Sequence, residues 1–503
     1  MKEKRDGWER RTFIPQLSVL ISLLLLLSTG AGCGPRRTPD LERIFETARA
    51  REGKRPVIVI PGILGSQLIN RRTGEVVWPS VFRSSEDGLS LPTTPDLEAN
   101  RDELDAAKII SSAQFGRVGT RAFGPEVYVY YELLQALQKY VGYREGNWDA
   151  PAPDGDRDTF YVFAYDWRRD NVESARLLVR RIEELKRRLN RPDLRFNILA
   201  HSMGGLVARY AAMYGDTDLP TGDAPTRPTW AGASGINKIF MIGTPNEGSA
   251  EAFSTLLEGY SVTEGLRRRV RLLNKLSRED ALTAPSIFQL LPHRHAARFL
   301  DEHLQPLELD LYDPAVWKLY GWSPISEAGF RERFVQRKTD TEDPPHEGAT
   351  LEELDAYFVA VLARARRFHE ALDANDRASN PPPVTLFAFG GDCEETLAAP
   401  VILRDERRGR WLTLTRPRPL RTPDGRRISR TDVTRAMYGP GDGRVTRQSL
   451  LGEELGPERR SLLFNSALPI AYATFVCDLH SELQKNKTLQ DNALTLLVSE
   501  LMK

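Results

Sequence analysis

The stretch FNILAHSMGG, residues 196–205, decides the fold class of this chain. Residues 196–200 form an apolar run typical of a buried strand, and a helical pattern starts at the glycines and continues to Tyr214. A strand that turns at once into a helix places Ser202 on a sharp bend at the carboxyl edge of a sheet. Small residues at Ala200 and Gly204 permit that bend, because a larger Cβ would clash with the crossing elements. The stretch therefore predicts that Ser202 is a nucleophile.

Further strand and helix patterns alternate on both sides of this bend. A helical stripe with spacings of three and four follows the second strand, over residues 172–189. Near-continuous apolar strands that alternate with helices predict an α/β fold with a mostly parallel sheet, covered by helices on both faces. The strand patterns lie at residues 56–60, 159–165, 196–200, 236–242, 384–389 and 470–476.

Two insertions interrupt this alternation. The first spans residues 66–124, and the second, residues 250–383, contains mainly helix and loop patterns typical of a cap. Triproline 381–383 precedes the point where the strands resume. We therefore expect residues 55–503 to form one catalytic domain.

The first 32 residues have the order of a secretory signal peptide, with a basic start, the apolar run 17–27 and small residues after it. The sequence Gly-Ala-Gly before Cys33 resembles a bacterial lipobox, in which that cysteine is lipidated; an ordinary signal peptide with a free Cys33 is the alternative. We expect a protein of the bacterial cell envelope that is lipid-anchored in the outer membrane, or else periplasmic or secreted. Residues 33–54 are polar and predict a tether.

The composition argues against several classes of protein. Of the 503 residues, 41% are hydrophobic, and 70 Lys and Arg balance 69 Asp and Glu to a net charge of +1. Such a chain can bury a hydrophobic core. It lacks the overall excess of basic residues that is typical of a nucleic-acid-binding protein. Because the overall charge gives no sign of a basic surface, we expect membrane attachment through lipid on Cys33.

Cysteine and histidine usage bears on disulfides and metals. Two cysteines remain after Cys33, namely Cys393 and Cys477, and in an oxidising compartment they can pair; two buried free thiols are the alternative. His293 and His295 have no accompanying carboxylate or cysteine pattern, so we expect solvated cap residues. No metal and no cofactor are expected.

A serine nucleophile requires a histidine base and an acid that orients the histidine. Of the seven histidines, only His480 follows the last strand, and His201 is expected to shape the bend. Two acids remain candidates: Asp392 directly follows the strand 384–389, and Asp442 lies in the glycine-containing loop GDGRVT, residues 441–446.

The oxyanion of an acyl-transfer intermediate requires two backbone N–H donors. One comes from the residue after the nucleophile, Met203, and the other from the loop PGILGS, residues 61–66, where Ile63 is the expected donor.

Six segments together resemble the lecithin:cholesterol acyltransferase family, which includes lysosomal phospholipase A. The resemblance implies an α/β-hydrolase fold, a triad of Ser202, Asp442 and His480, and oxyanion donors Ile63 and Met203. It also implies a cap with membrane-contacting segments and a structural role for residues 165–168. The six segments are PVIVIPGILGSQL (56–68), VVWPS (76–80), FAYDWRRD (163–170), AHSMGG (200–205), GTPNEGS (243–249) and GDGRVT (441–446).

The resemblance implies a serine-dependent lipid acyl-hydrolase or O-acyltransferase that acts on phospholipid or other long-chain esters through an acyl-enzyme. The expected partners are a lipid substrate and a membrane surface. A generic esterase or peptidase of the same fold, and a catalytically silent lipid-binding lipoprotein, are the alternatives.

Overall fold

The computed structural model describes residues 38–79, 88–111, 117–118, 121–122, 130–220, 226–261, 275–323, 325, 327–332, 351–374, 382–452 and 468–501. The chain divides into a short unit, Met1–Asp40, and a large compact unit, Leu41–Lys503. All helices and strands of the described residues lie in the large unit. The predicted signal peptide, residues 1–32, and Cys33 lie outside the described residues.

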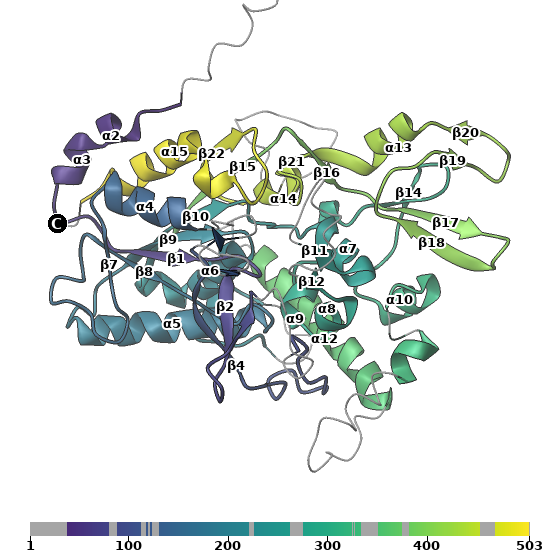
Figure 1. The fold of residues 1–503 in the computed structure, drawn as a ribbon, viewed down its shortest axis with the longest axis horizontal. Helices are drawn as coiled ribbons and strands as arrows, with labels where there is room; N and C mark the ends of the chain where they lie inside the picture. Colours follow the sequence, from purple (N-terminus) through teal and green to yellow (C-terminus); the bar gives the residue numbers. More distant parts are fainter. Residues whose placement is uncertain are drawn as a thin grey trace, which may run out of the picture. The chain divides into compact units, whose positions relative to one another are not determined.

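A seven-stranded sheet forms the centre of the large unit, and its strand pairs are all parallel (Figure 1). The predicted α/β-hydrolase class, with a mostly parallel sheet, is confirmed. Strand β9 is the fourth of the seven, so Ser202 follows the central strand. In spatial order the strands are β22 (Ile470–Val476), β15 (Thr385–Gly391), β10 (Ile236–Ile242), β9 (Phe196–His201), β1 (Val57–Ile60), β8 (Thr159–Val162) and β7 (Arg144–Glu145).

Helices cover both faces of this sheet because the strands are apolar on both sides. In β1 the side chains of Ile58 and Ile60 belong to one buried cluster, and those of Val57 and Val59 belong to the other. The first cluster includes the apolar stripes of α5 (Asn171–Arg188) and α6 (Met203–Tyr214). The second includes those of α4 (Tyr131–Lys139) and α15 (Lys487–Val498).

The packed structure begins earlier than the sequence predicted. Two short helices, α2 (Leu41–Ile44) and α3 (Glu46–Ala50), occupy part of the predicted tether, residues 33–54. Leu41 and Phe45 are buried in the second cluster, and Lys54 is buried beside Asp158, with 2.7 Å between its Nζ and the carboxylate. The buried stripe consists of only two apolar residues four positions apart. It is too short to be recognised in the sequence as a helical pattern.

The first insertion, residues 66–124, contributes a three-stranded sheet in the order β3-β2-β4. Arg168 joins this insertion to the loop after β8: its guanidinium is buried and contacts the carboxylates of Asp102 and Asp166 at 2.6 and 2.7 Å. This ion-pair network gives Arg168 the structural role that the resemblance implied. The strands of the insertion are β2 (Ser66–Asn70), β3 (Val76–Trp78), β4 (Leu104–Ile109), β5 (Arg117–Val118) and β6 (Arg121–Ala122).

The described part of the second insertion, residues 250–383, is mostly helical. Its longest helix, α12, packs against α6 and α9. None of the helices within the described ranges combines the length and the apolar character needed to cross a bilayer. The helices are α7 (Ala250–Glu258), α8 (Arg278–Leu282), α9 (Pro285–Phe288), η3 (Arg294–Ala296), α10 (Pro314–Tyr320) and α12 (Leu351–Asp373), and the strands are β11 (Tyr260–Ser261), β12 (Lys275–Leu276), β13 (Phe299–Leu300) and β14 (Pro306–Leu307).

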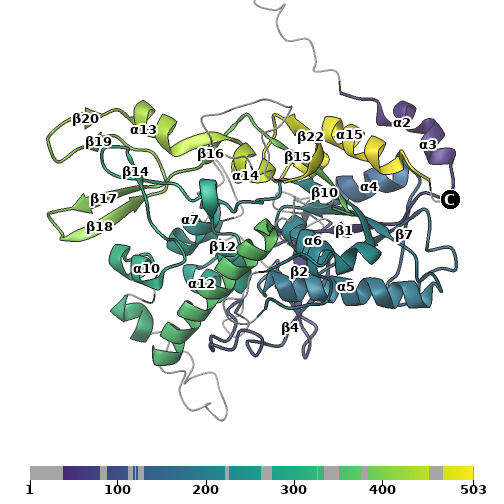
Figure 2. The same ribbon diagram turned by 180° about the vertical axis from the view of Figure 1, so that it is seen from behind.

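A projection, which we call the arm (residues 398–437), leaves the central sheet after β15. Strands β16 (Glu394–Leu397) and β21 (Tyr438–Gly441) pair antiparallel at its base, so the chain leaves and returns at one place. Figures 1 and 2 show its two hairpins at the periphery of the large unit. The arm contains β17 (Val401–Asp405), β18 (Arg410–Leu414), β19 (Leu420–Arg421), β20 (Arg427–Ile428) and α13 (Arg430–Met437).

The remaining short helices are η1 (Ala231–Ser234), α14 (Arg447–Leu451) and η5 (Leu483–Lys485).

Candidate active site

Ser202 occupies a strained bend between β9 and α6. Its backbone has φ 53° and ψ −126°, a conformation that non-glycine residues rarely adopt and that is typical of a nucleophile on such a bend. The helix after the bend lies against its neighbours: a Cβ on Gly204 would stand 2.6 Å from the carbonyl oxygen of Pro61, and one on Gly205 would stand 2.0 Å from Oγ1 of Thr244. Only glycine fits at these two positions.

The structure brings together the three residues predicted to form the triad. The Nε2 atom of His480 lies 3.0 Å from Oγ of Ser202, and its Nδ1 atom lies 2.7 Å from Oδ2 of Asp442. All three residues are buried. With the Nδ1 proton donated to the carboxylate, Nε2 is left to accept the proton of the serine hydroxyl.

Asp442 is held as a carboxylate by its surroundings. Its Oδ1 accepts hydrogen bonds from the backbone N–H groups of Arg444 and Val445, at 3.0 and 2.8 Å. Burial raises the pKa of Asp442, but the neighbouring His480 and these hydrogen bonds outweigh that effect, so the pKa lies below its usual value. Asp442 is therefore ionised at neutral pH and can stabilise a protonated His480.

Asp392, the other acid considered from sequence, lies elsewhere at the same edge of the sheet. Its side chain is 31% exposed, and its Oδ2 is 3.8 Å from the guanidinium of Arg447. Of the two carboxylates, it is Asp442 that contacts His480 in the structure.

His201 connects the loop after β1, through Tyr130, to the loop that carries His480. The hydroxyl of Tyr130 accepts a hydrogen bond from the Gly62 N–H at 2.8 Å and lies 2.9 Å from Nδ1 of His201. The other ring nitrogen, Nε2, lies 3.2 Å from the carbonyl oxygen of His480. Because that carbonyl can only accept, Nε2 carries the proton and Nδ1 accepts from Tyr130.

Burial and the neighbouring His480 lower the pKa of His201 to about 3. A neutral imidazole with both nitrogens engaged holds the bend in place and is unsuited to act as a base. Tyr130 was missed from the sequence, because it lies 72 positions before Ser202 and at the start of a helix, with no local motif.

Three side chains, those of Tyr130, Tyr165 and Trp78, hold the loop expected to supply an oxyanion donor. The hydroxyl of Tyr165 donates to the carbonyl of Pro61 at 2.9 Å, and the indole N–H of Trp78 donates to that of Leu64 at 2.9 Å. Within the described part of the chain, the backbone N–H groups of Ile63 and Met203 form no hydrogen bond. These two donors are thus available to a substrate oxygen.

A disulfide joins Cys393 to Cys477, with 5.1 Å between the Cα atoms. The two cysteines follow the adjacent strands β15 and β22, whose pairing brings their ends together. Asp392 lies beside them, but sulfur atoms in a disulfide are not thiolate ligands, so this cluster does not suit a metal ion.

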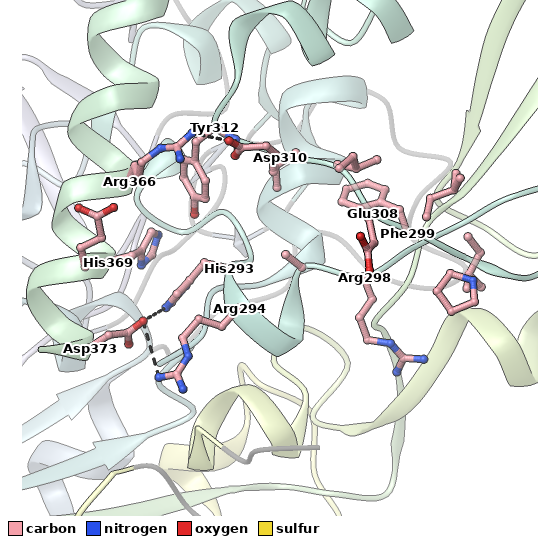
Figure 3. A pocket seen from close by; sticks show the side chains of 17 residues that line it. His293, Arg294, Arg298, Phe299, Glu308, Asp310, Tyr312, Arg366, His369 and Asp373 are labelled. Atoms are coloured by element: carbon pink, nitrogen blue, oxygen red, sulfur yellow. Dashed lines mark hydrogen bonds and ion pairs between the residues drawn. The ribbon is translucent and has the colours of Figure 1, made fainter. Parts of the chain in front are cut away.

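One sequence expectation for the cap is wrong. His293 was expected to be solvated, but it is buried, stacks on His369 at 4.0 Å between ring centres, and lies 3.1 Å from the carboxylate of Asp373. His295 is half-buried. Figure 3 shows His293, His369 and Asp373 at one end of a cavity of about 760 Å³ between α12 and residues 293–312. Ser202, His480 and Asp442 do not line this cavity.

Comparison with solved structures finds distant likenesses. The Tle4–Tli4 complex aligns over 89% of this chain and 99% of that chain at 14% identity, with a TM-score of 0.49. The mature lipase BlEst2 of Bacillus licheniformis aligns over 89% and 92% at 10% identity, with a TM-score of 0.31. EstA of Clostridium botulinum aligns over 93% and 92% at 12% identity, with a TM-score of 0.33.

Sequence comparison finds one family model that matches part of the chain. No curated protein shows a significant sequence match to the chain. The family model for lecithin:cholesterol acyltransferase matches residues 102–323, a range that includes Ser202 and the first part of the cap. This match confirms the resemblance to the lecithin:cholesterol acyltransferase family that the six segments show.

Proposed function

We propose that the chain is a serine-dependent lipid acyl-hydrolase or O-acyltransferase that acts on phospholipid or other long-chain esters through an acyl-enzyme. The observation that carries this proposal is the hydrogen-bonded chain from Ser202 through His480 to Asp442, with 3.0 and 2.7 Å between the paired atoms. The family match supports a lipid ester as substrate.

In the first step Oγ of Ser202 attacks the ester carbonyl while His480 takes the hydroxyl proton. The N–H groups of Ile63 and Met203 stabilise the oxyanion. The intermediate collapses as His480 protonates the leaving alcohol, and the acyl group remains on Ser202. Water or a second alcohol then attacks the acyl-enzyme by the same route, which releases a fatty acid or a new ester and restores the serine.

We also propose that the protein is located in the bacterial cell envelope. A lipid on Cys33 would hold the enzyme at a membrane, in the outer membrane of a bacterial cell, with the catalytic unit connected through residues 34–40. Signal peptide, lipidation and location all belong to this proposal and rest on the sequence pattern before Cys33.

Hydrolysis of p-nitrophenyl acyl esters tests the nucleophile. Ser202→Ala should abolish release of p-nitrophenol by the purified protein, whereas Ser234→Ala, an exposed serine in η1, should release it at the parent rate. Full activity of Ser202→Ala would contradict the proposal. Mass spectrometry of the products from mixed phospholipid and a long-chain alcohol then separates hydrolysis, which gives free fatty acid, from transfer, which gives a new ester.

A further inference from the structure

The arm, residues 398–437, concentrates a positive charge that the balanced composition conceals. It contains eleven arginines, no lysine and four acidic residues, a net charge of +7. The other 59 basic and 65 acidic residues give the rest of the chain a net charge of −6. The expectation that the chain has no basic surface was therefore wrong, because a sum over the whole sequence does not reveal a local cluster.

Most of these arginines form no ion pair with a described residue and are available to bind a partner. The only ion pairs that they form with described residues are those of Arg416 with Glu258, at 3.4 Å, and Arg435 with Asp432, at 3.7 Å. All eleven are exposed, namely Arg404, Arg407, Arg408, Arg410, Arg416, Arg418, Arg421, Arg426, Arg427, Arg430 and Arg435.

Aromatic and apolar side chains accompany the arginines at the first hairpin. The guanidinium of Arg404 lies 4.9 Å from the centre of the Trp411 ring, across the β17–β18 pair. Trp411 in turn packs edge-on against Tyr320 of α10, at 5.2 Å, and the neighbouring Leu319 is 59% exposed. Arginine combined with tryptophan and tyrosine suits the headgroup region of a bilayer, where one end of each side chain is apolar and the other is wet.

The base of the arm lies next to the candidate active site. Gly441, the last residue of β21, pairs with Glu394 and is followed directly by Asp442, which contacts His480. The arm also joins the cap, because Val401 of β17 pairs with Leu300 of β13. The base of the arm therefore lies at the edge of the sheet where an ester would enter.

We propose that the arm binds the anionic headgroups of a phospholipid membrane, with its guanidinium groups on the lipid phosphates and Trp411 in the interface. Arginine suits this role because its planar group donates two hydrogen bonds to one phosphate. The inference rests on the proposed function only for the choice of a membrane as partner. Nucleic acid or an acidic protein would also meet the charge, but neither accounts for the exposed Leu319 beside the first hairpin.

Cosedimentation with vesicles tests the proposal on the full chain carrying Cys33→Ser and Ser202→Ala, which removes lipidation and hydrolysis. The arm variant combines Arg407→Gln, Arg408→Gln and Arg410→Gln at the turn of the first hairpin. The matched control removes the same charge from helix α5, through Arg180→Gln, Arg187→Gln and Arg188→Gln, three arginines outside the arm.

The parent and the control should bind phosphatidylglycerol-containing vesicles more tightly than phosphatidylcholine vesicles, and more weakly as salt rises. The arm variant should partition at least tenfold less onto the anionic vesicles. Brominated phosphatidylglycerol should also quench tryptophan emission, and Trp411→Phe should remove that quenching.

Equal binding of the arm variant and the control to anionic vesicles would overturn the inference, as would equal quenching in Trp411→Phe. Preference of the parent for an oligonucleotide over vesicles of equal phosphate content would assign the arm to nucleic acid instead. Soluble-ester hydrolysis by the same arginine variants with Ser202 intact should match the parent. This separates a failure of the membrane inference, with hydrolysis intact, from a failure of the proposed function.

Discussion

At the scale of the residue, the site depends on which carboxylate faces the histidine. Both Asp392 and Asp442 follow strand β15 in the sequence, and both lie near the carboxyl edge of the sheet. Asp442 is 1% exposed and 2.7 Å from His480, whereas the side chain of Asp392 is 31% exposed. A buried, hydrogen-bonded carboxylate is the one that can fix the orientation and tautomer of an imidazole.

Substitution of the two acids should have unequal effects. Asp442→Asn should lower kcat on a soluble ester by about three to four orders of magnitude, because an amide at this position favours the wrong histidine tautomer. Asp392→Asn should leave kcat within about twofold of the parent, since this carboxylate does not contact His480. Steady-state kinetics on p-nitrophenyl butyrate measures both, and equal losses would contradict the assignment of Asp442.

The buried, neutral His201 makes stability depend on pH. Its pKa is about 3 in the folded chain and 6.5 when unperturbed, so between these values the unfolded state binds the additional proton. The free energy of unfolding should fall as pH decreases from 6.5 towards 3, by up to about 1.4 kcal/mol per pH unit from this residue. Above pH 6.5 this contribution to the slope should vanish.

Urea unfolding between pH 7.5 and 4 of the parent and of His201→Gln measures this slope. The variant should lose part of the pH dependence, and the exposed His303→Gln should keep it. Buried His369, whose pKa also lies well below its usual value, contributes to both proteins and cancels in the difference. Identical slopes for the parent and His201→Gln would show that His201 is not held neutral.

At the scale of the element, the site depends on how strand ends are tied to each other. The disulfide closes a separation of 84 residues between the ends of β15 and β22. Asp442 lies within the closed segment, and His480 comes three residues after Cys477. The bond therefore restrains both loops that form the Asp442–His480 contact.

Removal of the disulfide should destabilise the fold and the site together. Cys393→Ser with Cys477→Ser should lower the free energy of unfolding by about 2–4 kcal/mol, as for other bridges that close long loops. The thermal midpoint and kcat should both fall. Reductant should reproduce the effect in the parent and have none on the double variant; a parent whose midpoint resists reduction would contradict this role.

At the scale of the whole molecule, the sequence predicted the parts built from local patterns. The strand and helix at 196–214 set the position of Ser202, and the order of strands placed His480 after the last of them. Periodicity does not reveal contacts between distant segments. The chain from Gly62 through Tyr130 and His201 to the carbonyl of His480 joins four such segments, and only the folded structure displays it.

Two sequence predictions are wrong because they concern residues whose contacts come from distant segments. His293 was taken as solvated because the α12 residues His369 and Asp373, against which it packs, lie more than 70 positions away. Residues 41–50 were taken as tether because a two-residue apolar stripe has meaning only beside the cluster that buries it. The burial of His293 and the packing of residues 41–50 depend on tertiary structure, which cannot be seen in a short stretch of sequence.

The central step of the proposed reaction is the formation of a bond between the ester carbonyl carbon and Oγ of Ser202. The enzyme is mixed with a long-chain p-nitrophenyl ester or a phospholipid, and the reaction is quenched rapidly. Digestion and mass spectrometry then detect this bond directly. We expect the peptide containing Ser202 to gain the mass of the fatty acyl group before steady state, and the adduct to disappear when substrate is exhausted. Rapid consumption of the ester with an acyl group formed on another residue, and with Ser202→Ala as active as the parent, would contradict the account.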